Sequence, residues 1–151
     1  MGMYTELVLS ARIDLSDKDF LSDLEYMVEG NDDLSKSYQN KTQHRLFQIS
    51  NRWHYMLRSD SSYFSGTTHS DIFKNEDSFS PAWYLTVRCN LKNYDGEIEA
   101  FLDWLAPHIS ESGFLGYSRY EEFKNPTLIY LERDGKISLE PRTEECEEWK
   151  N

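Results

Sequence analysis

The sequence predicts an α+β domain in which two tandem strand-helix-strand-strand repeats form a mainly antiparallel sheet with two helices on one face. The main observation is internal similarity, because segment 7–13 matches segment 85–91, so that residue 7 corresponds to residue 85. Hydrophobic residues alternate within both segments, and after each segment they recur at helical spacing. The same offset relates Asp17 to Asp95, Phe20 to Ile98, Leu24 to Leu102, Tyr26 to Trp104 and Met27 to Leu105.

A chain of 151 residues is long enough to bury a core, and we expect residues 1–151 to form a single domain. Aromatic residues make up 15% of the chain, which predicts a core rich in large rings. The predicted divisions are repeat one at about 4–65, a connecting loop at about 66–81, repeat two at about 82–139 and an acidic tail at 140–151.

The first repeat begins with a strand and a helix. Apolar and polar residues alternate from Tyr4 to Ile13, which predicts a strand with one buried face. Asp17 can accept hydrogen bonds from the first free N–H groups of a helix, and apolar residues follow it at helical spacing. Gly30 is a natural C-terminal stop because glycine adopts left-handed backbone angles without strain.

The remainder of the first repeat predicts loops and short strands. Residues 31–43 are polar and predict a loop, whereas 46–49 and 53–57 are rich in apolar and aromatic residues and predict strands. A turn cluster at 59–62 precedes residues 63–64, which would open another short strand.

The second repeat follows the same order. Alternation over 83–91 predicts a strand, Asp95 is the matching helix cap, and Pro107 ends the helix because it lacks an N–H donor. Asp134 and Gly135 form a strong hairpin turn. Three further strands are predicted at 114–120, 127–133 and 137–139.

The charge balance excludes several classes of protein. With a formal net charge of -11 and a pI near 4.7, the chain is not expected to bind nucleic acid in bulk through phosphate contacts. No apolar run is long enough for a membrane span and no secretory signal begins the chain, so we expect a cytoplasmic protein without membrane contact. Cys89 and Cys146 suggest neither a disulfide framework nor a metal site.

Catalytic motifs are not recognisable. The sequence has no Gly-rich phosphate loop, no nucleophile elbow and no zinc-binding His-Glu-x-x-His motif, so we expect no cofactor and no metal, and we name no catalytic residue. A general acid–base pair could still be hidden among 27 acidic residues, which leaves enzymatic activity open. The histidines stand singly in the sequence at His44, His54, His69 and His108.

The positions of the arginines predict a binding surface. Lysines fall in loops and helix ends, whereas five arginines fall inside predicted strands. Strand parity places most of these arginines on the helix-free face of the sheet, where planar guanidinium groups could bind an anionic ligand, an acidic peptide or stacked single-stranded nucleic acid. The candidate binding residues are Arg12, Arg52, His54, Arg58, Tyr84, Arg88 and Arg119.

Two alternatives stand beside this interpretation. The arginines could instead pair across strands with carboxylates such as Glu6 and Glu132. The two helices could also present acidic rows that imitate a phosphate backbone, although a solvated helix face is the common outcome of such a pattern. The acidic helix residues are Asp19, Asp23, Glu25, Glu29, Glu97, Glu99 and Asp103.

Three runs of the sequence carry a resemblance to a known group of proteins. They are Asn90–Ile98, Gly113–Glu122 and Ser61–Phe64. The chain resembles small uncharacterised bacterial proteins associated with phage and mobile elements. That group has no assigned activity, so the resemblance implies a small accessory protein and assigns no functional residue.

These observations together predict a small acidic cytoplasmic protein that binds or regulates a protein partner or an anionic ligand without catalysis. One alternative is a small enzyme or small-molecule binder with a pocket between the two repeats, for which the polar loops would serve as lids. Another is a nucleic-acid mimic that inhibits a basic partner. Strand order, oligomeric state and the identity of the ligand do not follow from the sequence.

Overall fold

The computed structural model describes residues 3–30, 44–49, 51–59, 64, 68–77, 79–93 and 95–141. It is an α+β fold with a six-stranded antiparallel sheet in the order β2-β3-β1-β4-β5-β6. The strands are β1 (Tyr4–Ile13), β2 (Asp71–Asn75), β3 (Ala82–Lys92), β4 (Gly113–Tyr120), β5 (Thr127–Leu131) and β6 (Ile137–Glu140). The helices are α1 (Lys18–Glu29), α2 (Leu46–Ile49) and α3 (Glu97–Leu105), with 3₁₀ turns η2 (Asn51–His54), η3 (Met56–Arg58) and η4 (Ala106–His108).

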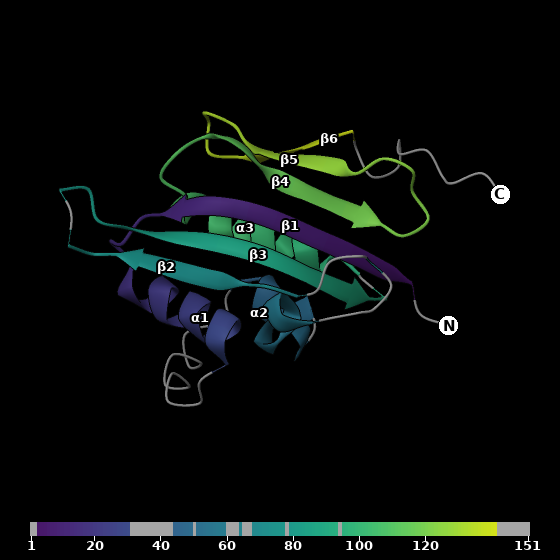
Figure 1. Cartoon of the computed structure of the whole chain (residues 1–151), viewed down its shortest axis with the longest axis horizontal. Coiled ribbons are helices and arrows are strands. Elements are labelled where there is room, and N and C mark those ends of the chain that lie inside the picture. Colours follow the sequence, from purple (N-terminus) through teal and green to yellow (C-terminus); the bar gives the residue numbers. More distant parts are fainter. Residues whose placement is uncertain are drawn as a thin grey trace.

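The connectivity explains the position of the central strands. The chain runs β1-α1-β2-β3-α3-β4, and β1 and β3 pair in the middle of the sheet with β2 and β4 outside them. This is the split β-α-β arrangement, here extended beyond β4 by the β5–β6 hairpin. In Figure 1, α3 lies behind β1 and β3, while α1 and α2 lie below β2.

One face of the sheet forms the core, as the alternation predicts. Leu7 and Leu9 of β1 and Val87 of β3 are at most 1% exposed and point toward the helices. They belong to the same buried cluster as Leu24 of α1 and Phe101 of α3, so both helices cover this face. Each helix buries its single apolar stripe on the sheet, which is why the two occupy one side.

The ends of α1 follow the predicted capping. Asp17 accepts a hydrogen bond from the backbone N–H of Phe20 at 3.1 Å. Gly30 adopts a φ of 69°, and its N–H donates to the carbonyl of Tyr26 at 2.7 Å. Any side chain at this glycine would also meet the guanidinium group of Arg58, which lies 2.7 Å from the position of a Cβ atom. The left-handed backbone angle favours glycine here, and a larger residue would also require the Arg58 side chain to shift.

The predicted cap of the second helix is wrong. The residue before α3 is Gly96, with a φ of 84°, and it makes no side-chain capping bond. The carboxylate of Glu97 instead accepts the backbone N–H of Asp95 at 2.7 Å. The left-handed glycine turns the chain sharply into the helix, so Asp95 lies outside the first turn and cannot cap it.

Two predicted strands of the first repeat are also wrong. Segments 46–49 and 53–57 fold as α2 and as the 3₁₀ turns η2 and η3. Leu46, Met56 and Leu57 are at most 1% exposed, because these short turns pack into the core beside α1 and β3. A short apolar run is compatible with a buried strand or a buried turn, and tertiary packing decides between them.

The predicted connecting loop at 66–81 contains the edge strand β2, which pairs with β3 in a register that places Ile72 opposite Leu85. Within the described ranges the first half therefore has one strand after its helix, whereas the second half has three. The tandem strand-helix-strand-strand architecture is not confirmed. Predictions for the loop at 31–43 and for residue 63 lie outside the described residues, as does the tail beyond residue 141.

A pH dependence of stability follows from His108 in η4. Its ring stacks on Phe20 with centroids 3.7 Å apart, and burial lowers its pKa from 6.5, opposed by the charges of Asp17 and Asp14. The unfolded chain then binds a proton at His108 more readily than the folded chain. The contribution of neutral His108 to stability is therefore fully present above pH 6.5 and is lost as the pH falls through the pKa of the folded state.

We expect the free energy of unfolding to fall as the pH decreases below 6.5, because the unfolded chain takes up a proton at His108 more readily than the folded chain. Urea denaturation at several pH values measures this slope. The variant His108→Phe retains a ring on Phe20 and should have a shallower slope than the wild type. Equal slopes in both proteins would show that other groups cause the dependence.

Candidate functional site

The face of the sheet opposite the helices carries the candidate site, an aromatic row that crosses five strands. It consists of two groups of direct register partners on adjacent strands: Phe73 is opposite Tyr84 and Tyr84 is opposite Arg12, while Phe114 is opposite Tyr130. The row comprises Phe73 of β2, Tyr84 of β3, Arg12 of β1, Phe114 of β4 and Tyr130 of β5. We call these five residues the aromatic row.

The aromatic row is exposed. Phe73 is 64% exposed, Phe114 is 59% exposed and Tyr84 is 39% exposed. The ring centroids of Phe73 and Tyr84 are 6.2 Å apart, and those of Phe114 and Tyr130 are 5.4 Å apart in a T-shaped arrangement. Isolated exposed apolar residues are common, but several that adjoin on a rigid sheet are typical of an interaction surface.

Arg12 occupies the middle of the aromatic row in an anchored position. Its guanidinium carbon lies 6.0 Å from the ring centroid of Tyr84. One terminal nitrogen donates to the carboxylate of Glu111 at 3.2 Å, and the other donates to the carbonyl of Ser80 at 3.4 Å. These contacts restrict the side chain before any partner arrives, which lowers the entropy lost on binding.

Arg88 and Arg119 lie on the same face of the sheet as the aromatic row, toward the other end of β1. Both contact the carboxylate of Glu6. Glu6 is fully buried, and its two oxygens lie 3.5 Å from Arg88 and 3.0 Å from Arg119. The guanidinium group of Arg119 stacks on Phe64 at 4.7 Å, and Phe64 is itself buried. The alternative of cross-strand pairing with Glu6 is therefore observed here, and both arginines are engaged although their side chains remain partly exposed.

Arg52 does not lie in a strand. It belongs to η2, where its side chain lies 3.4 Å from the carboxylate of Glu97 and donates to the carbonyl of Lys92 at 2.6 Å. These bonds join η2 to the end of β3 and the start of α3. The predicted place of Arg52 on the helix-free sheet face is wrong because the segment is helical.

The same correction applies to His54 and Arg58. His54 stacks on Trp53 with ring centroids 3.8 Å apart. Arg58 donates to the carbonyl of Met27 at 3.3 Å and to the carbonyl of His54 at 2.9 Å, so it satisfies free carbonyls near the end of α1. Both side chains serve the packing of η2 and η3 on α1, and a binding role for them stays a prediction.

The acidic helix residues do not form continuous exposed rows. Asp23 is 7% exposed and Glu97 is 4% exposed. Glu25 forms an ion pair with Lys74, and Asp103 lies 3.3 Å from His44. A polyanion mimic requires regularly spaced free charges, and these positions are partly buried or paired.

Cys89 is an unsuitable nucleophile. The thiol is fully buried in β3, and burial raises its pKa to about 12, with a smaller contribution from the charge of Glu6. A reactive cysteine needs an accessible thiolate, which this environment disfavours. Cys146 lies outside the described residues.

The sequence missed three members of the aromatic row. Phe73 falls in a segment predicted as a loop, although the adjacent apolar residues Ile72 and Phe73 could have indicated a short strand. Strand parity alone would have misplaced Phe114, because a bulge between Phe114 and Gly116 shifts the register of β4 against β5. Tyr130 lies in a correctly predicted strand and could have been found by the same parity that placed Tyr84.

Other kinds of site find little support. Among the described residues no three His, Cys, Asp or Glu side chains gather where they could hold a metal ion. Within the same part of the chain no helix combines the length and apolar character needed to cross a membrane. No protein-family model, curated protein or solved structure matches the chain at a significant level.

Proposed function

We propose that this protein is a non-enzymatic binding protein whose aromatic row holds a protein partner. The observation that carries the proposal is the exposure of Phe73, Tyr84 and Phe114 around the anchored guanidinium of Arg12. Tyrosine and arginine are enriched among the residues that dominate binding energy at protein interfaces. A sheet holds such side chains in fixed positions, so little order is lost when a partner binds.

Charge favours a protein over a nucleic acid as the partner. The chain carries a formal net charge of -11, and the arginines on this face already contact carboxylates: Arg12 contacts Glu111, while Arg88 and Arg119 contact Glu6. Binding to single-stranded nucleic acid combines base stacking with a positively charged groove. The aromatic row supplies stacking surfaces without the accompanying excess of positive charge.

Replacing Phe73 and Phe114 together with serine should weaken partner binding at least about tenfold, because both side chains lose the apolar area they would bury. The partner would be captured from the native host with immobilised wild-type protein. Its affinity for each variant would then be measured by calorimetry with the purified partner.

A matched control removes exposed apolar area elsewhere. Ile49 and Tyr55 are 42% and 49% exposed and lie on the helical segment, so Ile49→Ser with Tyr55→Ser should leave binding unchanged. Equal affinities for all three proteins would overturn the proposal. Binding of a labelled single-stranded oligonucleotide that is lost in Phe73→Ser with Phe114→Ser would favour nucleic acid instead.

A small-molecule binder is the second candidate function, and a groove beside α3 favours it. Its lining comes from the second half of the chain apart from Arg45, so the groove does not lie between the two predicted repeats. The cytoplasmic location, the regulatory role and the mobile-element context stay predictions.

We also propose that the two halves contain copies of a shorter strand-helix unit. The offset seen in the sequence relates Leu9 to Val87, and these residues are direct partners in the β1–β3 pair. A twofold axis through that pair would place the paired residues Leu7 and Cys89 on the paired residues Leu85 and Ala11, respectively. Superposition of β1 and α1 on β3 and α3 tests this, and a rotation that fails to exchange the two helices would contradict it.

A further inference from the structure

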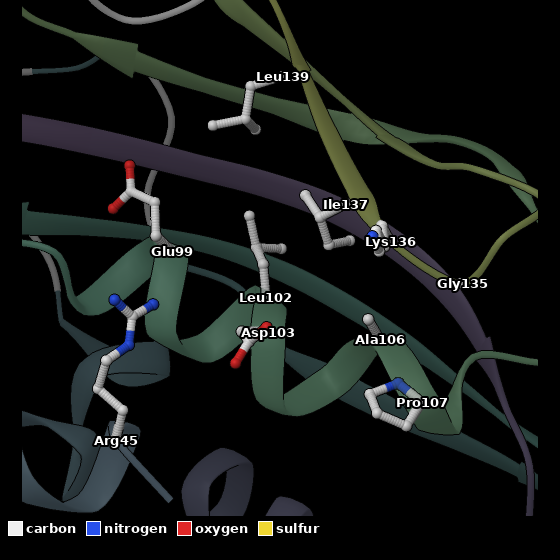
Figure 2. A pocket seen from close by; sticks show the side chains of 10 residues that line it. All are labelled: Arg45, Glu99, Leu102, Asp103, Ala106, Pro107, Gly135, Lys136, Ile137 and Leu139. Atoms are coloured by element: carbon white, nitrogen blue, oxygen red, sulfur yellow. The ribbon is translucent and has the colours of Figure 1, made fainter.

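A groove of about 460 Å³ lies between α3 and the β5–β6 hairpin, on the side of the sheet opposite the aromatic row. This volume falls within the range of small-molecule sites, roughly 300–1,000 Å³. Figure 2 shows Leu102 of α3 facing Ile137 and Leu139 of β6 across the groove. These three side chains provide apolar walls, and Ala106 and Pro107 line one end.

Glu99 is the unusual polar group of this groove. One of its carboxylate oxygens is shielded from solvent and has no hydrogen-bond partner among the residues that the structure describes. Burial raises the pKa of Glu99, and the nearby positive charge of Arg45 partly opposes this shift. A buried carboxylate oxygen without a donor is costly, so the position favours a ligand that brings an N–H group.

Arg45 adds an opposite charge at the same end. Figure 2 shows its guanidinium group rising toward Glu99 from the segment before α2. Within the described residues Arg45 and Lys136 form no ion pair, whereas the other acidic lining residue, Asp103, lies 3.3 Å from His44. A guanidinium group presents a planar set of donors suited to a carboxylate.

We propose that this groove binds a zwitterion with an apolar body, of which a free apolar amino acid is the simplest example. The ammonium group would pair with the carboxylate of Glu99 where that side chain lines the groove, and the ligand carboxylate would accept from Arg45. The side chain would lie between Leu102 and Ile137. The proposal is independent of the aromatic row, because the two sites occupy opposite faces of the sheet.

L-leucine is the probe for this site, and its binding to the full-length protein would be followed by NMR chemical shifts. We expect saturable shifts that include Glu99, Leu102 and Ile137. Leucinamide retains the ammonium group and N-acetyl-leucine retains the carboxylate, so each should bind more weakly than leucine. The two derivatives separate the contribution of Glu99 from that of Arg45.

Two variants assign the contacts. Glu99→Gln should weaken leucine and leucinamide at least about tenfold and leave N-acetyl-leucine unchanged. Arg45→Gln should weaken leucine and N-acetyl-leucine and leave leucinamide unchanged. Glu132→Gln, which removes an exposed carboxylate after β5, is the matched control and should bind all three probes like the wild type.

Two results would overturn the proposal. Leucine could fail to shift the spectrum of a folded wild-type protein, or its affinity could be the same in Glu99→Gln as in the wild type. In either case the raised pKa of Glu99 would reflect its burial alone.

Discussion

Replacing Gly116 with alanine should destabilise the protein by more than about 3 kcal/mol, the largest effect that we expect from any single methyl group. A Cβ atom at this position would lie 2.0 Å from the carbonyl oxygen of Val8 and 2.6 Å from the Cα of Leu9. Both contacts are with backbone atoms, so no side-chain rotation can relieve them. β4 would have to move away from β1 at the centre of the sheet.

Gly135 provides the matched control for this prediction. It has a φ of 86° in the β5–β6 turn, and a Cβ atom there would meet no atom of the described part of the chain within 4 Å. Gly135→Ala should therefore cost only about 1 kcal/mol, which reflects backbone strain without a clash. Chemical denaturation of both variants measures the difference. Similar losses in the two proteins would mean that β4 can shift without disturbing the sheet.

The second large effect concerns the buried carboxylate of Glu6. Replacing Arg88 and Arg119 together with methionine should lower the free energy of unfolding by about 3–5 kcal/mol, because Glu6 is fully buried and would lose both of its cations. Methionine retains much of the apolar stem of arginine, so contact with Phe64 is largely preserved. The measured loss then reports the unpaired charge.

Adding Glu6→Leu to this double variant should restore most of the lost stability, since no buried charge remains. Urea denaturation of the double and triple variants measures the recovery. A triple variant as unstable as the double variant would show that the arginines act through packing, without a contribution from charge. The result also bears on binding. If Arg88 and Arg119 are needed to neutralise the buried Glu6, they are poorly available to an external ligand.

The central strands were predictable from local pattern. Each of β1 and β3 alternates apolar and polar residues over about ten positions, and a strand buried on one face must show this period. The cap at Asp17 and the stop at Gly30 were predictable for a similar reason, since both depend on neighbours within one helical turn.

The segment between α1 and β2 shows where such prediction ends. Residues such as Trp53 and Leu57 suit a strand or a helical turn equally, and contact with α1 and β3 selected the turn. Arg52 and Arg58 were consequently placed on the wrong face. Side chains alternate between two faces along a strand but spread around the axis of a helical turn. A single error in secondary structure therefore removes several residues from a predicted surface.

Alternation, caps and the internal similarity thus determine the class of the fold, its central pair of strands and the outward direction of Arg12, Tyr84 and Arg88. Each of these properties depends on a short stretch of chain. Tertiary structure alone places Phe73 beside Tyr84 and turns Phe114 to the same face as Tyr130, because the order of strands and the bulge in β4 depend on contacts between distant segments. It also brings Glu99 and Arg45 to the same groove as Ile137 and Leu139, since α3 and β6 meet only in the folded molecule.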